Sequence, residues 1–153
     1  MNISVFDLFK IGIGPSSSHT VGPMFAAKQF LFNCIEQFPL ANIHTVKTEL
    51  FGSLALTGKG HGTDTAILMG LEGEEPALVD PKQIPNRLKH IRKNKTLKLL
   101  NEHKIGFNEE ESLIFIMMIY YRTIQMECVF LFLTQTGKNY VRRIFIQSEV
   151  DLS

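Results

Sequence analysis

Two short segments rich in small residues hold the side chains of this sequence that are best suited to chemistry. The first, Gly14 to Gly22, contains His19 after a run of serines, and a helix is expected directly after it. Backbone N–H groups at a helix start are unpaired and the helix dipole is positive there, so this segment can receive an anion. The serine hydroxyls and His19 would add side-chain donors. A plain helix cap with flexible glycines is the alternative, and the residues alone leave both readings open.

The second segment, Thr57 to Asp64, places His61 between Gly60 and Gly62. Glycine lets the backbone adopt unusual dihedral angles and approach another surface closely. An accessible histidine can transfer protons near neutral pH. We expect this segment to be a loop. Its spacing alone favours an ordinary surface turn, because a lone histidine lacks the partners that define a site.

Helices are expected on both sides of the first segment. Residues 4–9 form a short helix in which Ser4 can act as the cap. A longer helix begins near Pro23 and stops at Pro39. Its apolar stripe consists of Phe30, Leu31, Cys34, Ile35 and Phe38.

A strand and further helices are expected around the second segment. Alternating side chains predict a strand over Thr45 to Phe51, and Thr63 can cap a helix over Ala66 to Leu71. An irregular connection follows, marked by Pro76, Pro81 and Pro85. The lysine-rich stretch from Arg87 to Lys104 is predicted to be helical or helix–strand. Helices and strands mix without regular βα alternation, which favours an α+β fold.

Composition limits the classes of function. The chain has 153 residues, of which 44% are hydrophobic and 20% charged, so one folded domain is expected. A net charge of +1 gives no general case for binding nucleic acid or an anionic membrane. The apolar stretch from Leu113 to Leu133 is interrupted by polar residues and is too short on either side to span a bilayer. With no signal peptide at the start, the cytoplasm is the expected location.

The cysteines and the remaining histidines do not suggest a metal site. Cys34 and Cys128 cannot build a disulfide framework, and they are too few to hold an iron–sulfur cluster. No CxxC, HExxH or P-loop pattern is present, so no metal ligand is predicted in this chain. The remaining histidines are expected to be surface or satisfied residues: His44, His90 and His103. The basic residues are expected to form a solvated face: Arg87, Lys89, Arg92, Lys93, Lys95 and Lys98.

Two blocks of this sequence resemble bacterial L-serine dehydratase of the iron–sulfur type. One runs from Ser4 to Met24 and contains Gly-Pro-Ser-Ser-Ser-His-Thr, and the other runs from Leu50 to Asp64 and contains Gly-Lys-Gly-His-Gly-Thr-Asp. The resemblance covers about residues 2–115 and is to the β domain of that family. It implies an α+β fold with a small mixed sheet and helices, similar to the allosteric substrate-binding domain of some phosphoglycerate dehydrogenases.

The resemblance also implies a reaction. In that family L-serine loses water and then ammonia to give pyruvate, and a 4Fe–4S cluster acts as the Lewis acid on the substrate hydroxyl. The cluster belongs to a catalytic α domain that this chain lacks, whether it is on the same or a separate chain. His61 would be the leading candidate for the proton-transfer base, and His19 would hold the substrate or assist. The substrate carboxylate would be bound by Ser16, Ser17, Ser18 and Thr20.

Other functions remain open on the sequence. The same domain could act alone as a module that binds a small carboxylate or phosphate, without chemistry, or it could be a non-functional remnant. L-serine and an α domain are the expected partners, nucleic acid and membranes are not, and pairing into a homodimer is left open. By itself, the chain is expected to be inactive.

The composition changes after about Phe115, where Asp, Gly and Pro become rare. The motifs that end the family's β domain are missing in this reading frame. In the adjacent frame, Met117 and Met118 must contribute Asp-Asp and Met126–Glu127 must give Gly. Permitted codons then restore an Asn-His-Pro-Asn-Gly-Met stretch and a later Gly-Gly-Gly-Phe stretch. The hypothesis is therefore that residues 116–153 are a frameshift-derived tail, with residues 2–115 as a truncated β domain.

Overall fold

The computed structural model describes residues 19–116, 126–134 and 139–146, with the backbone alone for His61 and for the last two ranges. The predicted helix over residues 4–9 lies outside this part of the chain. The elements follow in the order α2 (Val21–Ile35), η1 (Leu40–Asn42), β1 (Ile43–Phe51), α3 (Ser53–His61), α4 (Thr63–Leu71), α5 (Ile84–Asn94), β2 (Thr96–Leu99), β3 (His103–Gly106), α6 (Glu109–Ser112), β4 (Leu113–Phe115), β5 (Met126–Thr134) and β6 (Asn139–Ile146).

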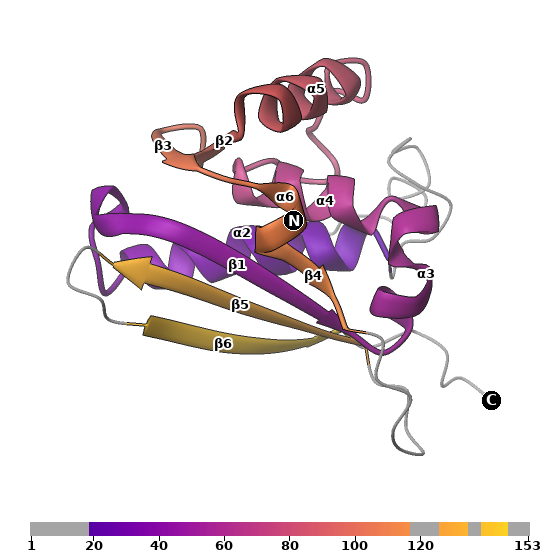
Figure 1. The fold of residues 1–153 in the computed structure, drawn as a ribbon, viewed down its shortest axis with the longest axis horizontal. Coiled ribbons are helices and arrows are strands. Elements are labelled where there is room, and N and C mark those ends of the chain that lie inside the picture. Colours follow the sequence, from indigo (N-terminus) through magenta and orange to yellow (C-terminus); the bar gives the residue numbers. More distant parts are fainter. Residues whose placement is uncertain (1–18, 117–125, 135–138, 147–153) are drawn as a thin grey trace.

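A mixed sheet forms one layer of the molecule (Figure 1). Its strand order is β4-β1-β5-β6, in which β4 runs parallel to β1 while β5 and β6 pair antiparallel. A separate antiparallel hairpin joins β2 to β3. The small mixed sheet with helices confirms the predicted α+β class. The predicted similarity to the domain of phosphoglycerate dehydrogenases stays a prediction.

The central strand β1 follows from its side-chain alternation. Val46, Thr48 and Leu50 are buried, while their neighbours Lys47 and Glu49 are half-buried. A strand that faces a core on one side requires this period of two. The predicted strand over Thr45 to Phe51 is confirmed and begins two residues earlier, at Ile43.

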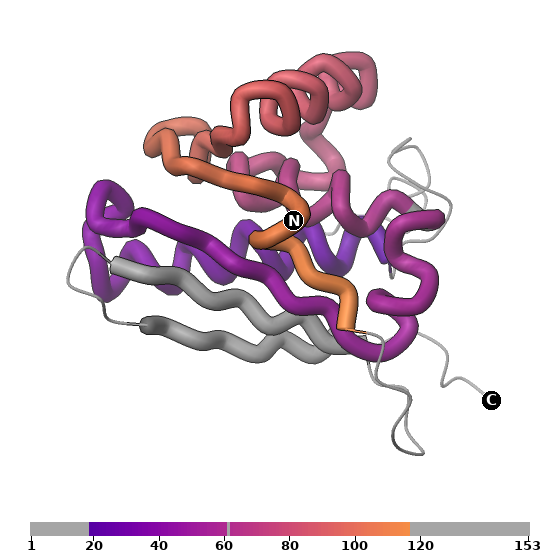
Figure 2. Tube along the Cα trace, viewed as in Figure 1, coloured from indigo at the N-terminus to yellow at the C-terminus, as the bar shows by residue number. Residues whose placement is uncertain are grey.

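Helices α2 and α4 pack against each other and form most of the core. Met24, Phe30 and Leu31 of α2 are fully or almost fully buried, as are Ile67 and Leu68 of α4. Figure 2 follows the chain from β1 through α3 into α4, which brings α4 back over α2. The buried side chains of β1 and the hairpin strands complete the same cluster.

The predicted apolar stripe is confirmed for its first three members, is wrong for Ile35, and is half-buried at Phe38, which lies beyond the end of α2. Phe30, Leu31 and Cys34 are buried and Phe38 is half-buried, but Ile35 is 38% exposed. Ile35 is the last residue of the helix, which ends four residues before Pro39. Because the helix ends at this point, none of the described elements covers the side chain fully.

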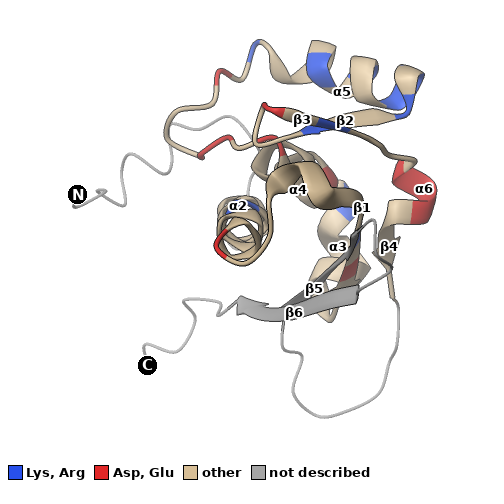
Figure 3. Cartoon of the chain, turned by 90° about the vertical axis from the view of Figure 1, so that its left-hand side faces the viewer, with Lys and Arg blue, Asp and Glu red and all other residues tan. Residues whose placement is uncertain are grey.

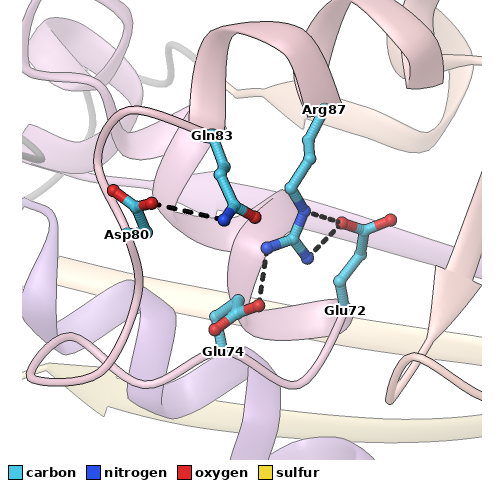
Figure 4. A network of polar contacts seen from close by, with 5 residues as sticks. All are labelled: Glu72, Glu74, Asp80, Gln83 and Arg87. Atoms are coloured by element: carbon cyan, nitrogen blue, oxygen red, sulfur yellow. Dashed lines mark hydrogen bonds and ion pairs between the residues drawn. The ribbon is translucent and has the colours of Figure 1, made fainter.

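Arg87 of α5 anchors the beginning of the connection between α4 and α5 (Figure 4). Arg87 donates to Glu72 Oε2 at 2.6 Å and 3.0 Å and to Glu74 Oε1 at 2.5 Å. Burial alone would lower the pKa of Arg87, but the hydrogen bonds and charges of Glu74 and Glu72 raise it above its ordinary value. Arg87 is therefore firmly charged. The prediction that it lies on a solvated face is wrong, because only 24% of its side chain is exposed.

Replacing Arg87 with methionine is expected to lower the free energy of unfolding by about 2 kcal/mol, because Glu72 would keep its charge without a partner. Glu72 is only 11% exposed, so water cannot fully replace the lost hydrogen bonds. Arg92→Met is the matched control. Its side chain is 46% exposed, and the expected loss is below about 1 kcal/mol. Urea denaturation measures both variants, and equal losses would contradict the difference in burial.

The charged side chains are distributed by element. Lys and Arg gather on α5 and acidic residues on α6 (Figure 3). As predicted, Lys89, Lys93, Lys95 and Lys98 are exposed. His44 and His90 are also exposed, and the His103 ring bonds to the Ile43 carbonyl at 2.9 Å. Across the described ranges, none of the helices has the length and apolar character needed to cross a bilayer.

Candidate functional site

The second small-residue segment is not a loop. It forms the end of α3 and the start of α4, separated by Gly62 alone. Gly62 has φ +78°, in the left-handed region that glycine adopts without strain, and its N–H caps α3 through the Gly58 and Lys59 carbonyls. The loop prediction rests on the low helix propensity of glycine. In the structure, tertiary packing outweighs that propensity, so the segment is helical on both sides of a sharp corner at Gly62.

Gly58 shows why a small residue is needed in α3. A Cβ at this position would lie 3.1 Å from the Phe115 ring and 3.2 Å from both Cβ and Oγ1 of Thr63. Phe115 belongs to β4 and Thr63 to α4. The glycine therefore lets α3 approach both elements, at the α3–α4 corner that contacts His19, two residues before α2.

The ring of His19 is held by α3. Its Nε2 atom lies 3.0 Å from Oγ1 of Thr57, and that hydroxyl lies 2.8 Å from the Ser53 carbonyl oxygen one turn earlier in the helix. Thr57 is exposed and His19 is half-buried. The two small-residue segments, far apart in sequence, are thus joined through this pair.

The backbone of His19 is held by α4. Thr63, which is fully buried, donates its hydroxyl to the His19 carbonyl at 2.5 Å. The prediction that Thr63 caps the helix over Ala66 to Leu71 is wrong: α4 begins at Thr63 itself, and its cap position, Gly62, carries no side-chain bond. The threonine hydroxyl fixes the neighbouring segment instead. With Thr57 on the ring and Thr63 on the carbonyl, α3 and α4 hold His19 at two points.

The other predicted site residues are placed only in part. Ser16, Ser17 and Ser18 lie outside the described residues. Thr20 is 2% exposed, and its carbonyl accepts the Met24 N–H at the start of α2. His61 is the last residue of α3, one position before the corner at Gly62. The roles given to all of these residues stay predictions.

A pocket of about 850 Å³ opens beside α3, on the side of α5 and α6. Lys59 and Phe115 line it, with the Lys59 ammonium 5.3 Å from the centre of the Phe115 ring. Arg92 crosses its wall and pairs with Glu109 at 2.6 Å and Asp64 at 3.2 Å. The hydrogen bonds that Arg92 donates to Glu109, together with the charges of Glu109 and Asp64, raise the pKa of Arg92 although partial burial lowers it. This polar wall ties α4, α5 and α6 together.

The described residues do not fit an iron–sulfur cluster. Cys34 is a buried thiol within the core cluster formed by α2 and α4. Within residues 19–116, no three His, Cys, Asp or Glu side chains gather where they could hold a metal ion. A cysteine inside this apolar core cannot reach a cluster.

Comparison with known proteins decides the family. A sequence model described as serine dehydratase beta chain matches residues 4–146. The chain belongs to this family. L-serine dehydratase of Streptomyces coelicolor is 47% identical over 114 residues, and L-serine dehydratase 1 of Escherichia coli is 48% identical over 114 residues. L-serine dehydratase of Mycobacterium bovis is 55% identical over 91 residues.

The family members are longer than the matched part. The Streptomyces and Escherichia matches each cover 74% of this chain and 25% of the relative, and the Mycobacterium match covers 60% and 20%. The chain therefore spans about a quarter of the length of the relatives it matches.

Sequence reasoning missed the two threonines that hold His19. The sequence patterns indicate Thr57 only as the first residue of the second small-residue segment and Thr63 only as a helix cap. One signal was present: Thr57 lies four residues after Ser53, within reach of its carbonyl, in the block that resembles the family. The contact between Thr57 and His19 spans 38 positions, and local patterns do not encode such a distance.

Proposed function

We propose that this chain is the β-domain portion of an L-serine dehydratase, which deaminates L-serine to pyruvate and ammonia when joined to a catalytic α domain. The match of the serine dehydratase beta chain model to residues 4–146 carries this proposal. The joined corner of α3, α4 and His19 supports it, because both resembling blocks meet there. A 4Fe–4S cluster, bound by the α domain, would supply the Lewis acid.

This chain would contribute binding and proton transfer. His61 is proposed as the base that removes the α-proton of L-serine, and His19 as the residue that holds or assists. Ser16, Ser17, Ser18 and Thr20 would offer donors to the substrate carboxylate near the start of α2, where the helix dipole favours an anion. The cytoplasm is the proposed location, because two cysteines and six methionines suit a reducing compartment.

Mixing experiments test the function. The chain alone is expected to give no pyruvate from L-serine after anaerobic iron–sulfur reconstitution, since the described residues offer no set of side chains that could ligate a cluster. The same chain mixed with the remainder of a relative, expressed without its matching quarter, is expected to form pyruvate. Pyruvate from the chain alone would overturn the first expectation. No pyruvate from the mixture, together with calorimetric binding of L-serine or phosphate, would favour a stand-alone binding module.

We also propose that residues 116–153 derive from a frameshift. The change in composition after Phe115 and the family motifs in the adjacent frame support this. The proposal has to accommodate the family model, which extends to residue 146, and strands β5 and β6, which pair with the sheet. The nucleotide sequence across the codons for Ser112 to Met117 tests it. A single intact frame with no family-like sequence in the adjacent frame would refute it.

A further inference from the structure

The hydroxyl of Thr57 touches two groups, and it has one proton to give. The Ser53 carbonyl oxygen lies 2.8 Å away and His19 Nε2 lies 3.0 Å away. A carbonyl oxygen has only lone pairs, so it can accept a hydrogen bond and never donate one. An imidazole nitrogen can do either, depending on which ring nitrogen carries the proton. The direction of the bond between Thr57 and the Ser53 carbonyl therefore fixes the direction of the bond between Thr57 and His19.

The proton of Thr57 lies on the Ser53 side. The 2.8 Å separation of the two oxygens is the usual length of an O–H···O hydrogen bond, and without a proton between them two sets of lone pairs would face each other. Threonine within a helix commonly bonds to the carbonyl four residues before it. With its proton used in this way, Oγ1 can only accept from His19.

We propose that Thr57 is a positioning residue that fixes the tautomer of His19, with the proton on Nε2 and the basic lone pair on Nδ1. Any group that meets Nδ1 of the neutral ring must then donate a proton to it. The Thr63 hydroxyl, bonded to the His19 carbonyl, holds the backbone from which the ring projects. The consequence for the site rests on the proposed function: as the residue that holds or assists, His19 would offer Nδ1 as a hydrogen-bond acceptor, while Nε2 stays bonded to Thr57 of α3.

Nitrogen NMR of the ¹⁵N-histidine-labelled chain tests this assignment at about pH 9, where an ordinary imidazole is neutral. The His19 signals are identified by their loss in His19→Gln. Nε2 is expected to show the shift of a protonated ring nitrogen and Nδ1 that of an unprotonated one. In Thr57→Val the preference for this tautomer is expected to fall about five- to tenfold, the value of one hydrogen bond, and Thr57→Ser is expected to restore it.

Thr45→Val is the matched control, because Thr45 is an exposed threonine on β1. It is expected to leave the His19 signals unchanged. An unprotonated Nε2 in the native chain, or His19 shifts in Thr57→Val equal to the native ones, would overturn the proposal. The measurement needs no activity. A chain that shows the expected tautomer but gives no pyruvate in the mixing experiment would overturn the proposed function and leave the assignment of Thr57 intact.

Discussion

Replacing Gly70 with valine is expected to lower the free energy of unfolding by about 3 kcal/mol, the upper range for an overpacked core. Gly70 lies in α4 where that helix meets α2. A Cβ at this position would overlap the Met24 carbonyl oxygen and lie 2.9 Å from Cβ of Ala27. The obstacle is helix backbone, which cannot rotate aside like the end of a side chain. The two helices would have to separate, and the core between them would lose contact.

Urea denaturation followed by circular dichroism measures the loss. Gly60→Ala is the matched control, because Gly60 also lies in a helix but a Cβ there would meet nothing within 4 Å. Alanine suits a helix better than glycine, so this control is expected to gain about 0.5–1 kcal/mol. If Gly70→Val does not fold, Gly70→Ala supplies a measurable value with the same sign. An unchanged midpoint for both Gly70 variants would show that α2 and α4 are not packed as described.

The predictable parts of the fold are those that local patterns encode. The period of two in β1 and the apolar stripe of α2 are repeated along the chain, so they place Val46, Leu50 and Phe30 in the core without knowledge of the rest. The segment around Gly58 and Gly60 was predicted incorrectly for the opposite reason. Its helix packs closely against Phe115 of β4, which lies far along the sequence, and a local pattern does not encode that approach.

The candidate site divides in the same way. His19 and His61 were found because their motifs stand out among small residues. The bond between Thr57 and the His19 ring and the bond from Thr63 to the His19 carbonyl are not predicted by local patterns, since they join segments that are 38 and 44 positions apart. Likewise, Arg87 belongs to a basic stretch by composition, but its ion pairs with Glu72 and Glu74 hold its side chain in a mostly buried position. The residue types of the site can thus be predicted from the sequence, whereas their bonding partners depend on how distant segments pack.

Replacing His61 with alanine is expected to reduce kcat for L-serine about 10²- to 10⁴-fold in the mixture of this chain with the remainder of a relative, the range for loss of a general base. This expectation rests on the proposed function. His61 ends α3 beside the corner at Gly62, and the Thr57 and Thr63 bonds hold His19 against the same two helices. His19→Ala is expected to have a smaller effect on kcat and to raise KM, because His19 is proposed to hold the substrate.

His90→Ala is the matched control for both histidine variants. His90 is exposed on α5, and its ring bonds to Asn94, which belongs to the same helix and not to the α3–α4 corner. Its replacement is therefore expected to leave kcat and KM unchanged. Circular dichroism confirms that each variant is folded before its rate is measured. A folded His61→Ala chain that supports the native rate would exclude His61 as the base. A fall of kcat in His19→Ala larger than that in His61→Ala would instead assign the proton transfer to His19.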